Sequence, residues 1–279
     1  MWRSLHCRYS LHHPLVRTQS ADEPWWSRGH ATLVEGPQGD WWMIYHAYEN
    51  GFRTLGRQTL LEPIEWTQDG WFKAMGGKLS TPIAKPTSSV GNQSGMALSD
   101  DFSHNRFGNQ WCFHNPGPID MARVSFANTQ LILEASGQSP ADSSPITCVA
   151  VDRSYQVEIS LSLSAEAEAG LLLFYNHKAF VGFGADGKVL KSFQYAEEQQ
   201  WARMGMPVRD IRLRLINDNH VVTYEYSVDK GKSWQRHPTR MEVSGMNHNV
   251  FGGFLSLKIA IYCAGKGKVI LSNFSYRAI

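Results

Sequence analysis

A histidine, an arginine and several tryptophans share one short stretch of this chain, "WWSRGHATLVEGPQGDWWMIYHAYENGFRTLGRQTLLEPIEW", which runs from Trp25 to Trp66. A guanidinium group offers five donors in a planar fork, which suits vicinal hydroxyls or carboxylates. Tryptophan rings can serve as platforms for the apolar faces of sugar rings. Together with a histidine, such residues can form a ligand site, so His30, Arg57, Trp25 and Trp26 are candidate ligand-binding residues. A saccharide is one ligand that would suit the tryptophans.

The same residues also have structural explanations. Aromatic residues make up 12% of the chain, with ten tryptophans, and cores rich in β-strands use aromatic side chains heavily. Trp41 and Trp42 lie inside a strand-like run, where packing is the better explanation than stacking on a sugar. For His30 the alternative is a core histidine with its hydrogen bonds satisfied, and for Arg57 it is an ion-pair partner between strands.

Carboxylates are the next candidates, because the hydrolysis of a sugar needs one acid and one base across the scissile bond. The acidic residues in the first part of the chain fall mostly in turns or at strand ends, where a solvated charge explains them. Glu49, in "YENGF", is placed to line a pocket, but one carboxylate is not an acid and base pair. An all-β enzyme that uses Glu49 or Asp22 is kept as the least favoured alternative.

Other catalytic and metal-binding patterns are absent from the sequence. It contains no H-E-x-x-H, no G-x-S-x-G and no glycine-rich phosphate loop. Cys7, Cys112, Cys148 and Cys263 match no metal or redox spacing, and the apolar run around Cys263 predicts a buried thiol. We therefore expect no required cofactor.

The composition is that of a globular protein, and it does not favour a strongly charged partner. Of 279 residues, 42% are hydrophobic and 19% are charged, and the formal net charge is +2. No basic stripe is visible, so we expect neither a nucleic acid nor an anionic membrane as partner. No run approaches the roughly 18 apolar residues of a membrane span, and the first residues make a poor signal peptide. The compartment stays open.

Two unequal parts surround a seam at residues 80–102, which is rich in Pro, Ser, Gly and Thr and is typical of a linker. Before the seam, four β-like runs are separated by the turn segments "GPQGD", "ENGFR" and "TQDG", and together they have the size of one β-propeller blade. After it, many short alternating runs predict an antiparallel sandwich. Only "AEEQQWARM" has some helical character. The predicted fold class is therefore all-β.

The motifs of both parts resemble one known family. "RGHATLVEGPQGDWWMIYH", "LGRQTLLEPIEW" and "DGWF" are similar to the last blade of the five-bladed propeller of glycoside hydrolase family 43. That family includes β-xylosidases, α-arabinofuranosidases and arabinanases. "DDFSHNRFGNQW", "VVTYEYSVDKGKSW" and the C-terminal segment resemble the concanavalin A-like (jelly-roll) sandwich of its β-xylosidase branch. The resemblance implies a remnant of the propeller at 1–82, a linker at 83–97 and the sandwich at 98–279.

The resemblance also implies roles for three residues. His30 matches the family's histidine at the start of the innermost strand, which helps to hold a water or a calcium ion beneath the sugar. Arg57 matches the arginine that faces the bound sugar and biases nearby carboxylate pKa values. Phe251 lies in a sandwich loop, from which an aromatic residue closes the active-site pocket in the β-xylosidase branch.

The sequence departs from the family pattern in its catalytic residues, and this departure determines the functional prediction. The family's two catalytic Asp and one Glu belong to earlier blades, and none of them can be carried over to this sequence. We expect a piece of a glycosidase for xylose- or arabinose-containing saccharides that has negligible activity alone. Its exposed blade faces would be covered by the missing half of the propeller or by self-association. The alternative is a non-catalytic carbohydrate-binding or scaffold sandwich.

Overall fold

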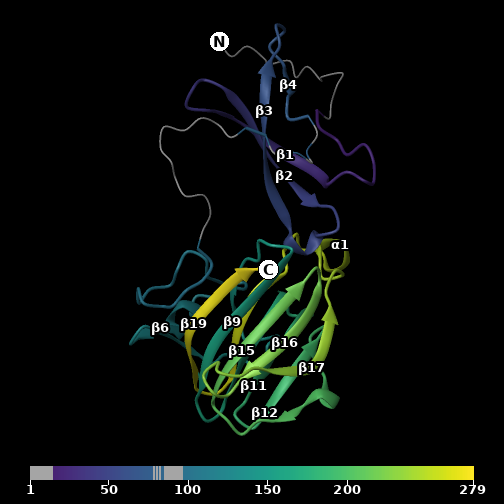
Figure 1. The fold of residues 1–279 in the computed structure, drawn as a ribbon. Coiled ribbons are helices and arrows are strands. Elements are labelled where there is room, and N and C mark those ends of the chain that lie inside the picture. The colour runs from purple at the N-terminus through teal and green to yellow at the C-terminus, as the bar shows by residue number, and fades with distance from the viewer. Residues whose placement is uncertain (1–14, 78, 80, 82, 85–96) are drawn as a thin grey trace. The chain divides into compact units, whose positions relative to one another are not determined.

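The computed structural model describes residues 15–77, 79, 81, 83, 84 and 97–279. They fall into two compact units, one within residues 15–53 and 57–84, the other with residues 54–56 and 97–279. Both are built from antiparallel strands, many of which are labelled in Figure 1, so the all-β prediction is confirmed. Most of the predicted linker, 83–97, lies outside the described residues, and the domain boundaries stay predictions.

The first unit is a four-stranded sheet in which each strand pairs with the next along the chain. Its order is β1-β2-β3-β4, with all three pairs antiparallel. The strands are β1 (Trp25–Glu35), β2 (Trp41–Glu49), β3 (Arg57–Trp66) and β4 (Phe72–Ala74). The short 3-10 turn η1 (Arg53–Leu55) lies between β2 and β3. The four runs expected from the sequence are thus four strands in the expected order.

All three predicted turns contain a glycine in the left-handed region, and two of them join their strands directly. Between β1 and β2 the Gly36 N–H donates to the Asp40 carbonyl at 2.7 Å, and Gly39 has φ 77°. Between β3 and β4 the Thr67 N–H donates to the Trp71 carbonyl at 2.7 Å. Positive φ at these turns is a conformation that glycine adopts without steric cost, which explains its place there.

One face of this sheet carries the small core of the first unit. Met43, Tyr45 and Ile64 are buried there, packed against partly buried apolar side chains that include Trp41 and Leu60. The Tyr45 hydroxyl donates to the buried Glu62 carboxylate at 3.1 Å. Burial, together with the charge of Glu62, raises the pKa of Tyr45 well above its ordinary value. The tyrosine therefore keeps its proton and satisfies the buried carboxylate.

The second unit is a sandwich of two antiparallel sheets. One has the order β13-β12-β11-β10-β18-β8-β5 with β14 beside β12, and the other has the order β17-β16-β15-β9-β19-β7-β6. The strands of the first sheet are β5 (Cys112–Phe113), β8 (Ile146–Cys148), β10 (Ala167–Asn176), β11 (Ala179–Ala185), β12 (Val189–Gln194), β13 (Glu197–Glu198), β14 (Met204–Gly205) and β18 (Lys258–Gly265). Those of the second are β6 (Val124–Ala127), β7 (Gln130–Glu134), β9 (Ser154–Leu163), β15 (Asp210–Asp218), β16 (Val221–Ser227), β17 (Gln235–Glu242) and β19 (Lys268–Ala278).

The main core lies between the two sheets. Strand β9 shows how the sequence builds it, because every second side chain from Tyr155 to Leu163 is buried and those between are half-buried. The thiols of Cys148 and Cys263 are buried in this core, and burial raises the pKa of each to about 12. The predicted buried thiol at Cys263 is confirmed.

A second apolar layer covers the other face of the eight-stranded sheet. Leu172, Phe174, Phe180, Phe193 and Tyr262 are among its buried members. Strands β10 and β11 are consequently buried on both faces, which explains why their sequences are apolar runs and do not alternate.

Irregular elements are few and short among the described residues. Besides η1, they comprise the 3-10 turns η2 (Asp120–Arg123) and η3 (Gln200–Ala202) and the single-turn helix α1 (His248–Phe251). The segment with predicted helical character, 196–204, contains η3 between the short strands β13 and β14. No described helix is long and apolar enough to cross a membrane.

Two histidines of the sandwich should make its stability depend on pH. Burial lowers the pKa of His237, which is 1% exposed, and of His114, where the charge of Lys258 adds to the effect. The folded state therefore binds protons less readily than the unfolded chain. Their contribution to stability is complete above about pH 6.5 and is lost as the pH falls below it.

We expect the unfolding temperature to fall between about pH 7.5 and about pH 5.5, before most carboxylates titrate at about pH 4. A His237→Gln variant should lose less stability over this window than the unsubstituted chain. Thermal unfolding followed by circular dichroism measures both. Equal unfolding temperatures at the two pH values would contradict the expectation.

Candidate saccharide-binding site

One end of the four-stranded sheet brings polar and aromatic residues together in rows. Trp26 on β1 pairs with Tyr48 on β2, and Tyr48 pairs with Arg57 on β3. Directly paired residues share a face of the sheet, so these three side chains form one row across three strands. The next row contains His46, beside Gly29 on β1 and Thr59 on β3.

An irregularity in β1 places His30 beside the second row. The register of β1 against β2 shifts between Trp26 and Gly29 and again between Gly29 and Thr32, and His30 has φ 54° within it. A positive φ is uncommon for a residue other than glycine, and β-bulges re-aim side chains next to functional sites. His30 Nδ1 lies 2.9 Å from His46 Nε2, and the two rings stack with centroids 5.1 Å apart.

The electrostatics of this pair favour a neutral imidazole at His46. Burial lowers the pKa of His46, and the positive charges of Arg57 and His30 lower it further. A single hydrogen bond joins the rings, so one of the two facing nitrogens must be an unprotonated acceptor. The Arg57 guanidinium lies 5.9 Å from the centroid of the buried Tyr48 ring, in an attractive cation–π position. The exposed Arg57 is thus held above an aromatic face.

Trp25 and Trp26 lie on opposite faces of the four-stranded sheet. Trp26 shares the face of Arg57, and its indole N–H donates to the Glu23 carbonyl at 3.1 Å. The Arg53 guanidinium lies 4.9 Å from its ring centroid. Trp25 precedes it in the strand and pairs with Glu49, so alternation directs both Trp25 and Glu49 to the opposite face. Trp26 is consequently the tryptophan that the structure groups with Arg57.

Phe251 lies in the second unit, at the end of α1. It is half-buried against the sandwich core, with its ring centroid 5.9 Å from that of Tyr175 and 6.4 Å from that of Tyr195. The Tyr175 hydroxyl donates to the Gly252 carbonyl, which fixes the residue that follows the helix. Packing therefore accounts for the position of Phe251 within its unit.

The carboxylates of the first unit are engaged in structural contacts. A cavity of about 580 Å³ is lined by residues that include Asp22, Glu23, Arg28 and Glu62. Glu23 pairs with Arg28 and accepts the Gln19 N–H at 2.6 Å, which together lower its pKa, and Glu62 accepts the Tyr45 hydroxyl. Asp22 lies at the exposed mouth of this cavity and donates its N–H to Ser20 Oγ at 3.2 Å. None of these contacts places a carboxylic acid opposite a carboxylate base.

A general acid for glycoside hydrolysis needs a raised pKa, and the described carboxyl groups show the opposite trend. Every one of them whose pKa departs from its ordinary value is shifted downward. These are Glu23, Asp69, Asp101, Asp120, Asp142, Asp186 and Asp229. The arrangement at His30 and Arg57 can bind and orient a polar ligand, and it offers no proton donor of the required kind.

Comparison with known families shows to which family the chain belongs. The family model "Beta xylosidase C-terminal Concanavalin A-like domain" matches residues 99–276, and the model "Glycosyl hydrolases family 43" matches residues 3–72. The chain belongs to glycoside hydrolase family 43. Both His30 and Arg57 lie in the second of these matches.

Solved structures share the fold of this family 43 chain. The GH43 protein BlXynB of Bacillus licheniformis superposes with a TM-score of 0.85 at 20% identity, covering 98% of this chain and 57% of that one. The xylan β-1,4-xylosidase of Bacillus halodurans C-125 gives a TM-score of 0.77 at 19% identity, covering 96% of this chain and 57% of that one. Identities this low show the fold alone.

A curated relative is similar over a shorter range. The non-reducing end α-L-arabinofuranosidase BoGH43B of Bacteroides ovatus is 33% identical over 100 residues, which are 34% of this chain and 19% of that protein. This family 43 chain therefore spans little more than half the length of the solved structures, and the matched region is a fifth of the curated relative.

Sequence reasoning named His30 and Arg57 as candidates and did not name His46, which the structure places beside His30. His46 is the last residue of the quoted motif "WWMIYH". It comes close to His30 only because the register of β1 shifts. Alternation along β2 was the available signal, since it puts His46 on the same face as Tyr48, next to the strand that carries Arg57.

Proposed function

We propose that this chain is the C-terminal part of a glycoside hydrolase acting on O-glycosyl bonds of xylan- or arabinan-type saccharides, and that it does not hydrolyse them alone. In this proposal 1–82 is the last blade of a five-bladed propeller, 83–97 is a linker and 98–279 is the appended sandwich. The names of the relatives, a xylosidase and an arabinofuranosidase, support the substrate class.

The observation that carries the proposal is the row of Trp26, Tyr48 and Arg57 beside the hydrogen-bonded His30 and His46. Arg57 has the donor geometry to bind vicinal hydroxyls, and its charge would favour ionised carboxylates on a neighbouring blade. The hydrogen bond with His46 holds the His30 ring in one orientation. These groups bind and orient a sugar, and none of them is a matched acid and base.

Hydrolysis with inversion requires a carboxylic acid at the leaving oxygen and a carboxylate that activates water on the other face. Each of these contributes roughly 10²–10⁴-fold to the rate. The described carboxyl groups with shifted pKa values are all shifted downward, and Glu49 is on the face opposite Arg57. The chain alone should therefore have negligible turnover.

A calcium ion, which the family resemblance suggests for the propeller, is not supported by the residues at this site. The described residues contain no group of three His, Cys, Asp or Glu that could hold a metal ion. Calcium takes oxygen ligands, whereas His30 and His46 offer imidazole nitrogens, and one nitrogen of each ring is already in their mutual hydrogen bond. His30 would instead position a water molecule or a sugar hydroxyl.

The experiment for this proposal is hydrolysis of 4-nitrophenyl β-D-xyloside and 4-nitrophenyl α-L-arabinofuranoside by the purified chain. We expect no release of nitrophenol above the buffer rate. Turnover that disappears in Arg57→Ala and persists in Arg240→Ala, a sandwich control, would overturn the proposal. Addition of the preceding blades, where the DNA upstream encodes them, should restore turnover, and Arg57→Ala should then lower kcat/KM by about 10²-fold.

An apolar surface of the first unit gives a further prediction. Val34, Ile44 and Leu61 lie on the same face of the sheet, where each keeps 36–39% of its surface exposed. Exposed apolar faces of this kind mark interfaces, and in a propeller the neighbouring blade would cover this one. We expect the isolated chain to bind a hydrophobic dye or to self-associate through this face.

The measurement compares dye fluorescence and sedimentation of the chain with those of an Ile44→Ser, Leu61→Ser double variant. The double variant should lose most of the dye signal and sediment as a monomer. Met75→Ser, at an exposed residue outside the strands, should change neither. A chain that is monomeric and binds no dye would contradict the prediction.

A further inference from the structure

The outward face of the seven-stranded sheet carries a hollow that is not part of the candidate site described above. On this face Ser160 of β9 pairs with Arg212 of β15 on one side and with Ser272 of β19 on the other. Ser162 pairs in the same way with Asp210 and with Ile270 of β19. Because the serine side chains are shorter than those beside them, a cavity of about 580 Å³ opens above them.

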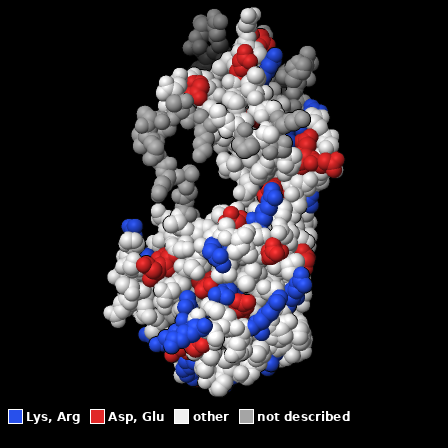
Figure 2. All heavy atoms as spheres, viewed as in Figure 1, with Lys and Arg blue, Asp and Glu red and all other residues white. Residues whose placement is uncertain are grey.

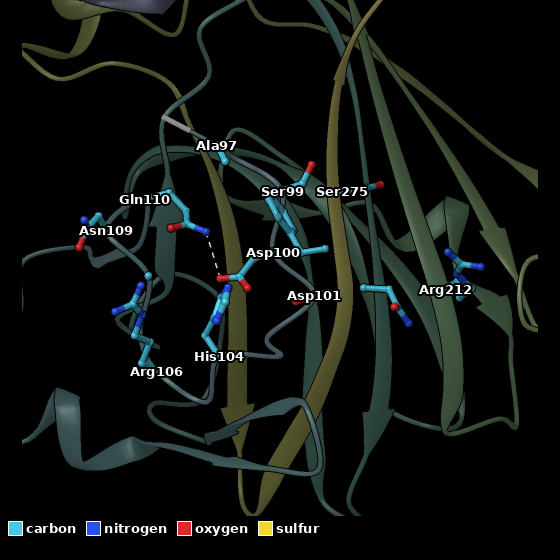
Figure 3. A pocket seen from close by; sticks show the side chains of 13 residues that line it. Ala97, Ser99, Asp100, Asp101, His104, Arg106, Asn109, Gln110, Arg212 and Ser275 are labelled. Atoms are coloured by element: carbon cyan, nitrogen blue, oxygen red, sulfur yellow. Dashed lines mark hydrogen bonds between the residues drawn. The ribbon is translucent and has the colours of Figure 1, made fainter. Parts of the chain in front are cut away.

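A second cavity of about 680 Å³ adjoins the first, and Arg212 and Asn273 line both. Figure 3 shows Gln110 turned toward Asp100 in this second cavity, with Arg106 nearby and Arg212 on a strand across from them. Each cavity lies within the range of about 300–1,000 Å³ that is usual for ligand sites. Because they share two lining residues, we consider the two open cavities together and call them the groove.

The shared residues are held in place by the fold. Asn273 lies in a break of the β19 register between Ser272 and Ser275 and has φ 54°, so the bulge turns its side chain out of the regular alternation. The Arg212 guanidinium donates to the Lys230 carbonyl at 3.0 Å and lies 3.5 Å from a Glu158 oxygen. Its geometry is therefore fixed before any ligand arrives, which lowers the cost of binding.

The chemistry of the groove suits a neutral ligand with many hydroxyl groups. Hydroxyl, amide and guanidinium groups line it and can donate and accept hydrogen bonds. Its permanent charges balance, with Asp100, Asp101 and Asp210 against Arg106, Arg212 and Lys230. Figure 2 shows acidic and basic side chains interspersed over the sandwich, so the face it displays has no expanse of a single sign that would recruit an anionic polymer.

We propose that this groove is a second saccharide-binding site, which binds a neutral linear oligosaccharide along the outward face of the sandwich. An open groove with two adjoining hollows accommodates several consecutive sugar rings, whereas a single sugar would fill only part of one hollow. The site lies wholly within the sandwich and shares no residue with the row at Arg57. It would keep a polymeric substrate close to the protein whether or not the chain has hydrolytic activity.

The test is calorimetric titration of the full chain with xylobiose, xylohexaose and α-1,5-arabinohexaose, together with polygalacturonate as an anionic comparison. At least one hexaose should bind about tenfold more tightly than xylobiose, because more hydrogen bonds form along the groove. Its affinity should be unchanged when the NaCl concentration is raised severalfold, since no ion pairs form with a neutral ligand.

Two variants and two controls locate the binding. Ser162→Tyr fills the hollow from an outward position, and Asn273→Gly removes the amide while keeping a residue that tolerates positive φ. Each should weaken hexaose binding by about tenfold. Thr223→Tyr and Arg240→Ala, at paired outward positions of β16 and β17 that do not line the groove, should leave the affinity unchanged.

Three results would overturn the proposal. The first is the absence of binding of both hexaoses. The second is binding that survives both Ser162→Tyr and Asn273→Gly. The third is binding of polygalacturonate alone, with an affinity that falls steeply with salt. Failure of the groove would leave the hydrolysis experiment unaffected, because Arg57 and the groove belong to different units and are tested by different variants.

Discussion

Replacing Gly170 by alanine should destabilise the concanavalin A-like sandwich by about 3 kcal/mol or more. Gly170 of β10 pairs directly with Gly184 of β11, and the Tyr262 ring lies over both. A Cβ atom at residue 170 would lie 2.2 Å from the Phe183 carbonyl oxygen and 2.5 Å from the Gly184 Cα. Because these are backbone atoms of a central strand, no change of side-chain rotamer can relieve the clash.

Gly205→Ala is the matched control, since an added Cβ there would meet no atom within 4 Å. Urea unfolding of the two variants measures the difference. Gly184→Ala should behave like Gly170→Ala, because its Cβ would lie 2.1 Å from the Tyr262 hydroxyl oxygen and 2.7 Å from the Ala169 carbonyl oxygen. Equal free energies of unfolding for Gly170→Ala and Gly205→Ala would show that the sheet can relax locally, contrary to this argument.

The glycines illustrate what the sequence could and could not predict about the fold. The alternation in "YQVEISLSL" predicted a strand with one buried face, and β9 has that burial pattern. "GLLLFYN" and "AFVGFG" predicted strands, but periodicity cannot tell that both faces are covered. The second layer on β10 and β11 depends on residues distant in the sequence, Tyr262 among them, and only the folded chain brings them together.

The candidate site was predictable to a similar degree. Family motifs pointed to His30 and Arg57, and strand pairing places them at the same end of one sheet. The hydrogen bond between His30 and His46 joins residues in different strands through an irregular register, which no local pattern encodes. Strand alternation, by contrast, was enough to separate Trp25 from Trp26, and the sequence prediction grouped them together without using it.

The buried ion pair at the edge of the sandwich should also be sensitive to substitution. Arg123→Met should cost about 3–5 kcal/mol, because it leaves the buried Asp120 carboxylate without its cation. Asp120 and Arg123 are only 6% and 8% exposed, and the guanidinium nitrogen NH1 donates to Asp120 Oδ1 at 2.8 Å. The guanidinium also donates through Nε to the Glu134 carbonyl at 3.1 Å. Its loss therefore leaves this carbonyl, a second acceptor, without that hydrogen bond.

The pH dependence of unfolding separates this explanation from lost packing. Burial acts to raise the pKa of Asp120, but the Gly117 N–H, Arg123 and Ser144 outweigh it and hold the pKa below its ordinary value. That contribution to stability is present above about pH 4 and is lost as the pH falls, so Arg123→Met should flatten the acid side of the stability profile. Asp120→Asn combined with Arg123→Met should cost less than Arg123→Met alone.

The surface pair of Arg203 and Glu198 provides the control, because Arg203→Met removes an exposed arginine whose carboxylate partner remains hydrated. Unfolding in urea at neutral pH should distinguish the two substitutions clearly. If Arg123→Met were as mild as Arg203→Met, or if the double substitution cost more than the single one, the Asp120 charge would not be the source of the loss. The geometry predicts the reverse, since Asp120 is only 6% exposed and water has little access to its carboxylate once the guanidinium is removed.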